Sequence, residues 1–201
     1  MKSRDKAEID RFVELAFVGG EHAAAAFSQL VGKPIRTQAP IVVEGDGAGR
    51  PSLSENDDSR WSTGVFFEFE GCLEAFVGIL FPGAASEALV RHIVGMESGD
   101  LEPQMIESAL MEAGNILASH VASAIADRMK SRLLPSIPSL AMENAEEAFR
   151  CFIENAVGRD TLRIESVLSD PTGALRGRLV LVPTGQLDPF DSGSDSEKRG
   201  V

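Results

Sequence analysis

Four polar side chains recur in one stretch of the sequence at spacings that match an α-helix. They are Ser108, Glu112, Asn115 and Ser119, in an i, i+4, i+7, i+11 pattern. At about 100° per residue, these positions fall within a narrow stripe on one helix face. A carboxamide can hold a water molecule by donating and accepting hydrogen bonds at once, and a carboxylate can pair with a partner's lysine. The stripe could therefore reach into a site on another protein, although the solvated face of any amphipathic helix has the same pattern.

The helix that carries this stripe is predicted to run from residue 104 to residue 134. Its apolar positions lie nearly opposite the stripe, and Pro135 and Pro138 follow its expected end. A second long helix is predicted over 7–31, with Gly32 as its C-cap. Shorter helices are expected over 84–94 and 144–156, the latter with Asn144 as N-cap, and strands over 41–44, 63–70, 73–81, 139–142, 161–168 and 174–182.

The two halves of the chain repeat one another with an offset of 98 residues. The matched pairs include Glu14 and Glu112, His22 and His120, and Pro40 and Pro138. This repeat predicts an α+β fold in which two long helices pack on an antiparallel sheet of about six strands, related by a pseudo-two-fold axis. We expect a single domain over 1–183 with halves of about 7–97 and 104–183, an exposed loop over 45–60 and a disordered acidic tail over 184–201.

Composition excludes several classes of function. The chain has 201 residues, and 31 Asp and Glu against 19 Lys and Arg give a net charge of −12. Such a surface repels nucleic-acid phosphates and anionic lipid, so we expect neither a nucleic-acid nor a membrane partner. The apolar runs are too short to span a bilayer, and the first residues do not read as a signal peptide. Two cysteines and three histidines without metal spacing predict a reduced, cytoplasmic protein with no metal site of its own.

The polar stripe resembles a family signature. Ser108-x-x-x-Glu112-x-x-Asn115, followed after 22 residues by Pro138, is similar to the motif of the CheC/CheX/FliY family of chemotaxis phosphatases. The stretch 13–35 resembles the family's first helix, and "GILFP" and "GRLVLVP" resemble the ends of its strand pairs. The duplicated layout and the length resemble the CheC branch of that family.

The resemblance implies a phosphatase that acts on the aspartyl-phosphate of a CheY-type response regulator. Both the phosphorylated Asp and the Mg²⁺ ion would belong to the regulator, so the chain would need no cofactor of its own. Asn115 would orient the attacking water, Glu112 would anchor the regulator's conserved lysine, and Ser108 would support the docking surface. Positioning and electrostatics supply most of the catalysis of phosphoryl transfer, so no nucleophilic side chain is required.

The first half departs from this signature. Asp10 and Glu14 stand at the motif's first two positions and would serve in binding, but Phe17 replaces the Asn. Phenylalanine cannot orient a water, so the first-half site is expected to be inactive. Phe17 falls on the polar stripe of its helix, where it would be covered by a loop or contact a partner, and we favour the cover. The helix is also expected to kink at Gly19-Gly20.

The sequence also bears on a further partner and on other functions. In the CheC branch, a helix after the second hairpin contributes to binding the deamidase CheD. The sequence after Val182 has no helical period, which argues against a CheD partner here. Two further hypotheses stay open. One is a non-catalytic module that sequesters a response regulator or serves in a signalling or flagellar assembly. The other is an unrelated α+β domain with a fortuitous motif.

Overall fold

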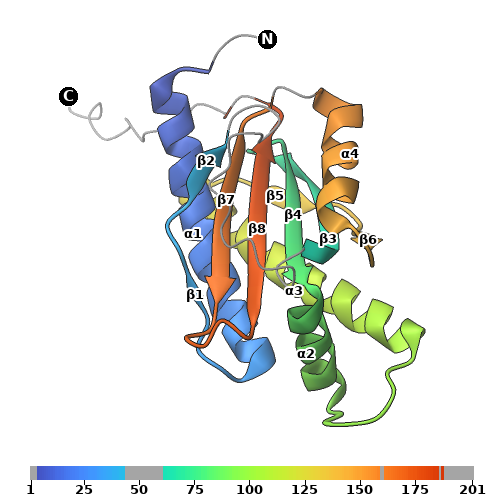
Figure 1. The fold of residues 1–201 in the computed structure, drawn as a ribbon. Helices are drawn as coiled ribbons and strands as arrows, with labels where there is room; N and C mark the ends of the chain where they lie inside the picture. Colours follow the sequence, from blue (N-terminus) through green and yellow to red (C-terminus); the bar gives the residue numbers. More distant parts are fainter. Residues whose placement is uncertain (1–3, 44–60, 159–160, 186, 188–201) are drawn as a thin grey trace, which may run out of the picture.

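The protein is described by a computed structural model covering residues 4–43, 61–158, 161–185 and 187. The predicted α+β class is confirmed, because two long helices pack on one face of an antiparallel sheet (Figure 1). These helices are α1 (Lys6–Val31) and α3 (Pro103–Met129). A shorter helix, α4 (Ala145–Val157), covers part of the opposite face, and α2 (Gly83–Val94) packs against α3.

The sheet interlocks the two halves of the chain. Its strands are β1 (Arg36–Thr37), β2 (Ile41–Val43), β3 (Trp61–Gly71), β4 (Ala75–Pro82), β5 (Leu133–Pro135), β6 (Ser139–Ala141), β7 (Arg163–Ser169) and β8 (Arg176–Pro183). The order is β1-β7-β8-β4-β3-β5, with β2 also paired to β7 and β6 also paired to β3. Each half therefore places its two short strands on the edge strand of the other half, while β4 and β8 pair at the centre.

The repeat is visible in the bounds of corresponding elements. β2 and β6 differ by the predicted 98 residues at both ends, and so do the last residues of α1 and α3. Within the residues that the structure describes, the sheet has eight strands where about six were expected, because β1 and β5 were missed. Strands of two or three residues are too short to show the alternation of apolar and polar side chains by which strands are recognised.

The second long helix is shorter than its sequence indicates. It was expected to reach residue 134 but ends at Met129, where Lys130 adopts a left-handed conformation with φ 51°. The backbone N–H of Lys130 donates to the carbonyls of Ala126 and Asp127, which closes the helix. The residues beyond it are extended, and β5 pairs with the end of β3. Pairing with the sheet thus overrides the helical periodicity that continues past Met129.

Two smaller expectations concern the N-cap of α4 and the glycine pair in α1. Asn144 occupies the N-cap position of α4, but it has φ 50° and its side chain makes no capping hydrogen bond. The Gly19-Gly20 pair does not interrupt α1, which is one helix from Lys6 to Val31. A Cβ atom added at Gly19 would lie 2.9 Å from Cγ1 of Val121, so this glycine permits the close approach of α1 and α3.

Two apolar cores hold the layers together. The larger lies between the sheet and the two long helices, and it includes the fully buried side chains Phe12, Phe27, Phe67, Leu110 and Leu117. The smaller lies between α4 and the other sheet face, where Phe149 packs on Phe66 with ring centroids 4.9 Å apart. Both faces of the central strands are therefore covered, so α3 rests on a rigid platform.

Some expectations concern parts of the chain outside the described residues. They are the loop over 45–60 and most of the tail over 184–201, of which the structure describes only 184, 185 and 187. Among the helices in the described ranges, none is long and apolar enough to cross a membrane.

Candidate functional site

The predicted stripe lies on the outer face of α3. Its four side chains, Ser108, Glu112, Asn115 and Ser119, are all exposed. The opposite face is fully buried against the sheet and α1 at Leu110, Ala113 and Leu117. The predicted orientation of this helix is confirmed: its apolar face makes the core, and its polar stripe points outward.

A glycine next to Asn115 sets how closely α3 approaches the sheet. A Cβ atom added at Gly114 would lie 2.7 Å from both Cβ and Cγ1 of Val65, on β3. Real Cβ atoms do not come so close, so only glycine permits this approach. The backbone that carries Asn115 is thereby held directly on a buried strand.

The two equivalent glutamates have different surroundings. The Glu14 carboxylate on α1 accepts a hydrogen bond from Nε of Arg128 at 2.9 Å, and a second from the same guanidinium, and this ion pair ties α1 to α3. Glu112 has no hydrogen-bond or ion-pair partner in the described part of the chain. The repeat explains the difference, because the position equivalent to Arg128 holds Leu30, which carries no charge. Of these two equivalent glutamates, Glu112 is the one with an unengaged carboxylate.

The remaining first-half residues are also located on the outer face of α1. Asp10 is exposed, and so is Phe17, with 38% of its surface accessible. The expectation that Phe17 is covered is therefore wrong. The first-half face combines an accessible aromatic ring with a carboxylate that is already paired, which is a different surface from that of α3.

A shallow hollow of about 410 Å³ adjoins the second-half stripe. Ser108 and Glu112 contribute to its wall from α3, and Ile93 and Val94 contribute from the end of α2. Asn115 lies one turn further along α3 and is not part of this wall. Two of the predicted residues thus border a concave surface, while the amide stands beside it on open helix surface.

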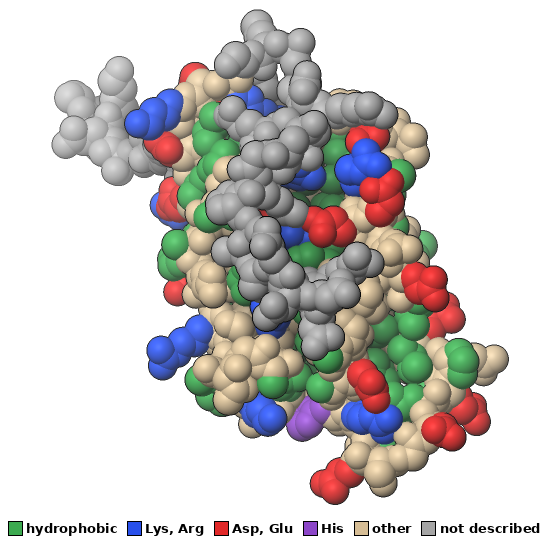
Figure 2. Space-filling view, in the orientation of Figure 1, with side chains coloured by type: hydrophobic (Ala, Val, Ile, Leu, Met, Phe, Trp, Pro, Cys, Tyr) green, Lys and Arg blue, Asp and Glu red, His purple; other side chains and the backbone are tan. Residues whose placement is uncertain are grey.

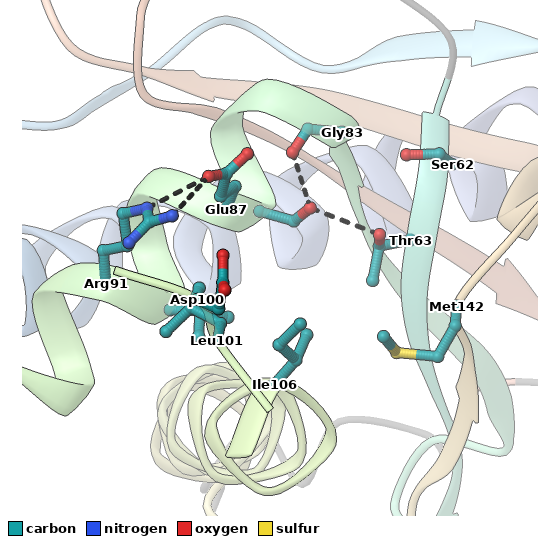
Figure 3. Close-up of a pocket in the computed structure, with 11 residues that line it drawn as sticks. Ser62, Thr63, Gly83, Glu87, Arg91, Asp100, Leu101, Ile106 and Met142 are labelled. Carbon is teal, nitrogen blue, oxygen red and sulfur yellow. Dashed lines mark hydrogen bonds and ion pairs between the residues drawn. The ribbon is translucent and has the colours of Figure 1, made fainter. Parts of the chain in front are cut away.

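A second cavity, of about 430 Å³, lies between α2, β3 and the start of α3 (Figure 3). Thr63 donates a hydrogen bond to the Ser86 hydroxyl at 3.3 Å, and Ser86 donates to the carbonyl of Gly83 at 2.8 Å. At the rim, Arg91 pairs with Glu87 at 2.9 Å. None of the predicted site residues lines this cavity, so it is separate from the stripe.

Metal binding by the chain's own side chains has no candidate in the ranges that the structure describes. No group of three or more His, Cys, Asp and Glu residues is placed to hold a metal ion there. Cys72 is buried in the connection between β3 and β4, and Cys151 is exposed on α4. The chemistry that the site can offer is therefore that of an exposed amide and an exposed carboxylate on one rigid helix.

Comparisons with known proteins agree with this reading of the fold. The family model described as "CheC-like family" matches residues 105–140, which include the stripe and the proline that follows it. "CheY-P phosphatase CheC" of Bacillus subtilis (strain 168) is 29% identical over 149 residues, covering 68% of this chain and 66% of that protein. The match thus spans slightly less than two thirds of the relative's length.

Solved structures show the same fold at low sequence identity. The crystal structure of Thermotoga maritima FliY is 18% identical with a TM-score of 0.64, over 92% of this chain and 93% of that chain. A chain of the CheX-CheY-BeF3-Mg+2 complex from Borrelia burgdorferi is 13% identical with a TM-score of 0.59, over 86% of this chain and 99% of that chain. The chain is similar to members of the CheC/CheX/FliY family, in sequence over residues 105–140 and in its fold. These similarities argue against the hypothesis of an unrelated domain with a fortuitous motif.

Three features of the site were not predicted from the sequence. They are the close packing of Gly114 on Val65, the ion pair of Arg128 with Glu14, and the hollow between α2 and α3. All three depend on contacts between distant segments. For the ion pair of Arg128 with Glu14, the only signal in the sequence is that the first-half position equivalent to Arg128 carries no cation.

Proposed function

We propose that the chain is a phosphatase that hydrolyses the aspartyl-phosphate of a CheY-type response regulator. The single observation that carries this proposal is the outer face of α3, where Asn115 and an unengaged Glu112 stand exposed on a helix seated tightly on the sheet. The names of the Bacillus subtilis relative and of the Borrelia burgdorferi complex supply the substrate class.

The proposed mechanism assigns the two side chains different tasks. Glu112 pairs with a lysine beside the regulator's phosphorylation site and so fixes the docked pose. The Asn115 amide accepts a hydrogen bond from a water molecule while donating one toward the phosphoryl group, which aims the water at phosphorus. The water oxygen bonds to phosphorus, the bond to the aspartyl oxygen breaks, and inorganic phosphate leaves. Ser108 lies beside Glu112 on the same docking face.

The Mg²⁺ ion of this reaction belongs to the regulator in our proposal. When bound there, it neutralises charge on the phosphoryl oxygens. The chain's own contribution is to place the water and to exclude unproductive poses, which is the part of the barrier that positioning can remove.

The first-half face is proposed to be inactive. Phe17 stands at the Asn position and has no hydrogen-bonding group, and Glu14 is engaged by Arg128. The sequence after Val182 has no helical period, and this still argues against a CheD partner.

Decay of the phosphorylated regulator tests the proposal directly. The source organism's CheY-type regulators are each phosphorylated with acetyl phosphate, and loss of phosphate is followed with and without the protein. We expect wild type to accelerate the loss, Asn115→Ala to remove about a hundredfold or more of that acceleration, and Glu112→Gln mainly to raise KM. Glu107→Gln is the matched control, because it removes the same charge from an exposed position of α3 outside the stripe.

The outcomes separate the enzyme from the alternative. A wild-type protein that accelerates no regulator's decay contradicts the proposal. Binding without acceleration supports the non-catalytic module that sequesters a regulator. Equal rates for wild type and Asn115→Ala contradict the role of the amide while leaving the activity in place.

A further inference from the structure

The hollow between α2 and α3 has a composition suited to one kind of side chain. Its apolar part includes Ile93, Val94 and Met105, which are only partly buried. Two carboxylates, those of Glu102 and Glu112, stand on the α3 side of the hollow. Among the described residues, no lysine, arginine or histidine lines it. An apolar floor with acidic ends fits the aliphatic stem and charged head of a lysine or arginine.

The two carboxylates are separate anchors. They are ten residues apart on α3, which corresponds to about 15 Å along the helix axis. A single basic side chain cannot pair with both. Glu102 stands at the N-cap of α3, but its side chain makes no capping hydrogen bond, and it has no ion-pair partner in the described ranges. Its charge is therefore free to act on a docked protein.

Acidic side chains also gather around this end of the molecule. Figure 2 shows them at the lower right, where Figure 1 places the start of α3 and the segment that leads into it. A positive patch on a partner would be drawn to this end over the distance that salt screening allows, about 8–10 Å at ordinary ionic strength.

The first half lacks the equivalent arrangement. At the offset of 98, the position of Glu102 is held by Arg4, which carries the opposite charge. The Arg4 guanidinium donates to the carbonyl of Pro183 at 3.0 Å and to that of Gly185 at 3.2 Å, so it serves the structure of its own end of the molecule. The pair of carboxylates that borders the hollow is thus particular to α3 and is not repeated on α1.

We propose that Glu102 is a second anchor for the response regulator, receiving a lysine or arginine whose stem lies over Val94 and Met105. The regulator would present this basic side chain about 15 Å from the lysine that Glu112 receives. This inference rests on the proposed function, and it makes Glu102 a determinant of which regulator is chosen. Glu102 is a binding residue and takes no part in the transfer of the phosphoryl group.

The test compares Glu102→Gln with Glu107→Gln. Both remove one negative charge from an exposed position near the start of α3, but Glu107 does not line the hollow. At low salt we expect Glu102→Gln to raise KM for the phosphorylated regulator about two- to fivefold with kcat unchanged. Glu107→Gln should leave both constants unchanged. The difference should vanish near 1 M NaCl, where the screening length falls to about 3 Å.

Two further measurements keep the outcomes distinct. Thermal unfolding of both variants checks that a change in KM does not come from a weakened helix start, since an acidic residue there also favours the helix dipole. Affinity for the regulator loaded with beryllium fluoride and Mg²⁺ reports binding without turnover.

If wild type binds but does not hydrolyse, the phosphatase proposal fails, and a weaker affinity of Glu102→Gln still supports the anchor. Equal KM and equal affinity for the two variants at low salt would overturn the anchor and leave the phosphatase proposal standing. Failure of wild type to bind any regulator would overturn both.

Discussion

The contact of Gly114 with Val65 sets both the packing of α3 on the sheet and the position of Asn115. In Gly114→Ala, the new methyl group would meet Cβ and Cγ1 of Val65 at 2.7 Å and Cγ2 at 2.8 Å. Carbon atoms pack at about 3.5–4.0 Å, so α3 must move away from β3 by about 1 Å. Val65 is fully buried and β-branched, and one of the contacting atoms is its Cβ, so rotation of the side chain cannot relieve the overlap.

The expected energetic effect has two opposing parts. Overpacking a well-filled core costs about 1–3 kcal/mol, with the upper end expected here because three atoms collide. Replacing a helical glycine by alanine contributes about 1 kcal/mol in the stabilising direction. We therefore expect Gly114→Ala to lower the free energy of unfolding by about 1–2 kcal/mol in urea titrations. Ala25→Gly, at an exposed position of α1, is the control that measures the intrinsic difference between the two residues.

The functional effect should exceed the effect on stability. A shift of about 1 Å in the backbone next to Asn115 can cost up to about a hundredfold in rate, because the aim of the water depends on that position. Binding of the regulator should change little. In a Val65→Ala background, two of the three clashing atoms are gone, so the Gly114→Ala penalty should shrink by at least about 0.5 kcal/mol. A Gly114→Ala protein as stable and as active as wild type would refute the reasoning about this contact.

Two other predictions concern groups away from the α3 face. Arg128→Leu, which installs the residue found at the equivalent position of α1, should cost no more than about 1 kcal/mol of unfolding free energy, because the side chains of Arg128 and Glu14 are 48% and 50% exposed. A loss above about 2 kcal/mol in urea titrations would contradict this, and phosphatase activity should not change. The Thr172 hydroxyl, and then the Leu175 backbone N–H, lower the pKa of Asp170 in the turn between β7 and β8. Because the pKa of Asp170 is lower in the folded state, its ionised carboxylate stabilises the fold above the unfolded pKa of about 3.9. This stabilisation is lost as the pH falls through the folded pKa. Unfolding curves from pH 6 to pH 2 should therefore show an acid-dependent loss that Asp170→Asn lacks, and parallel curves would contradict this role.

The sequence could predict those parts of the fold that depend on local pattern. The long helices, the two main hairpins and the outward direction of Glu112 and Asn115 follow from periodicity, and the structure confirms them. The end of α3 at Met129 and the short strand β5 could not be predicted in this way. There, the chain gains more from pairing with the end of β3 than from further turns of helix, and that competition involves residues more than sixty positions apart.

The repeat predicted the layout of the two halves but not their interlocking. Each half's short strands pair with the other half's sheet, so β3 supports β5 and β6, and β7 supports β1 and β2. No local pattern specifies that the short strands pair with the other half, because β3 and β7 present the same backbone groups for pairing. The consequence is that α3 and β3, which belong to different halves by sequence, meet at the close contact of Gly114 with Val65 beside Asn115.

This arrangement explains how the two repeated halves can carry different surfaces on one fold. The shared sheet fixes both long helices, so substitutions on their outer faces change the surface with little effect on the fold. On α1 those changes are Phe17 in place of an amide, and a Glu14 that Arg128 neutralises from the neighbouring helix. Arg128 comes from the second half, so the half that carries Asn115 also engages the equivalent carboxylate of the first half. If the proposed function holds, restoring an amide with Phe17→Asn would leave the anchor carboxylate paired. A second working face should therefore require Phe17→Asn and Arg128→Leu together, with neither change sufficient alone.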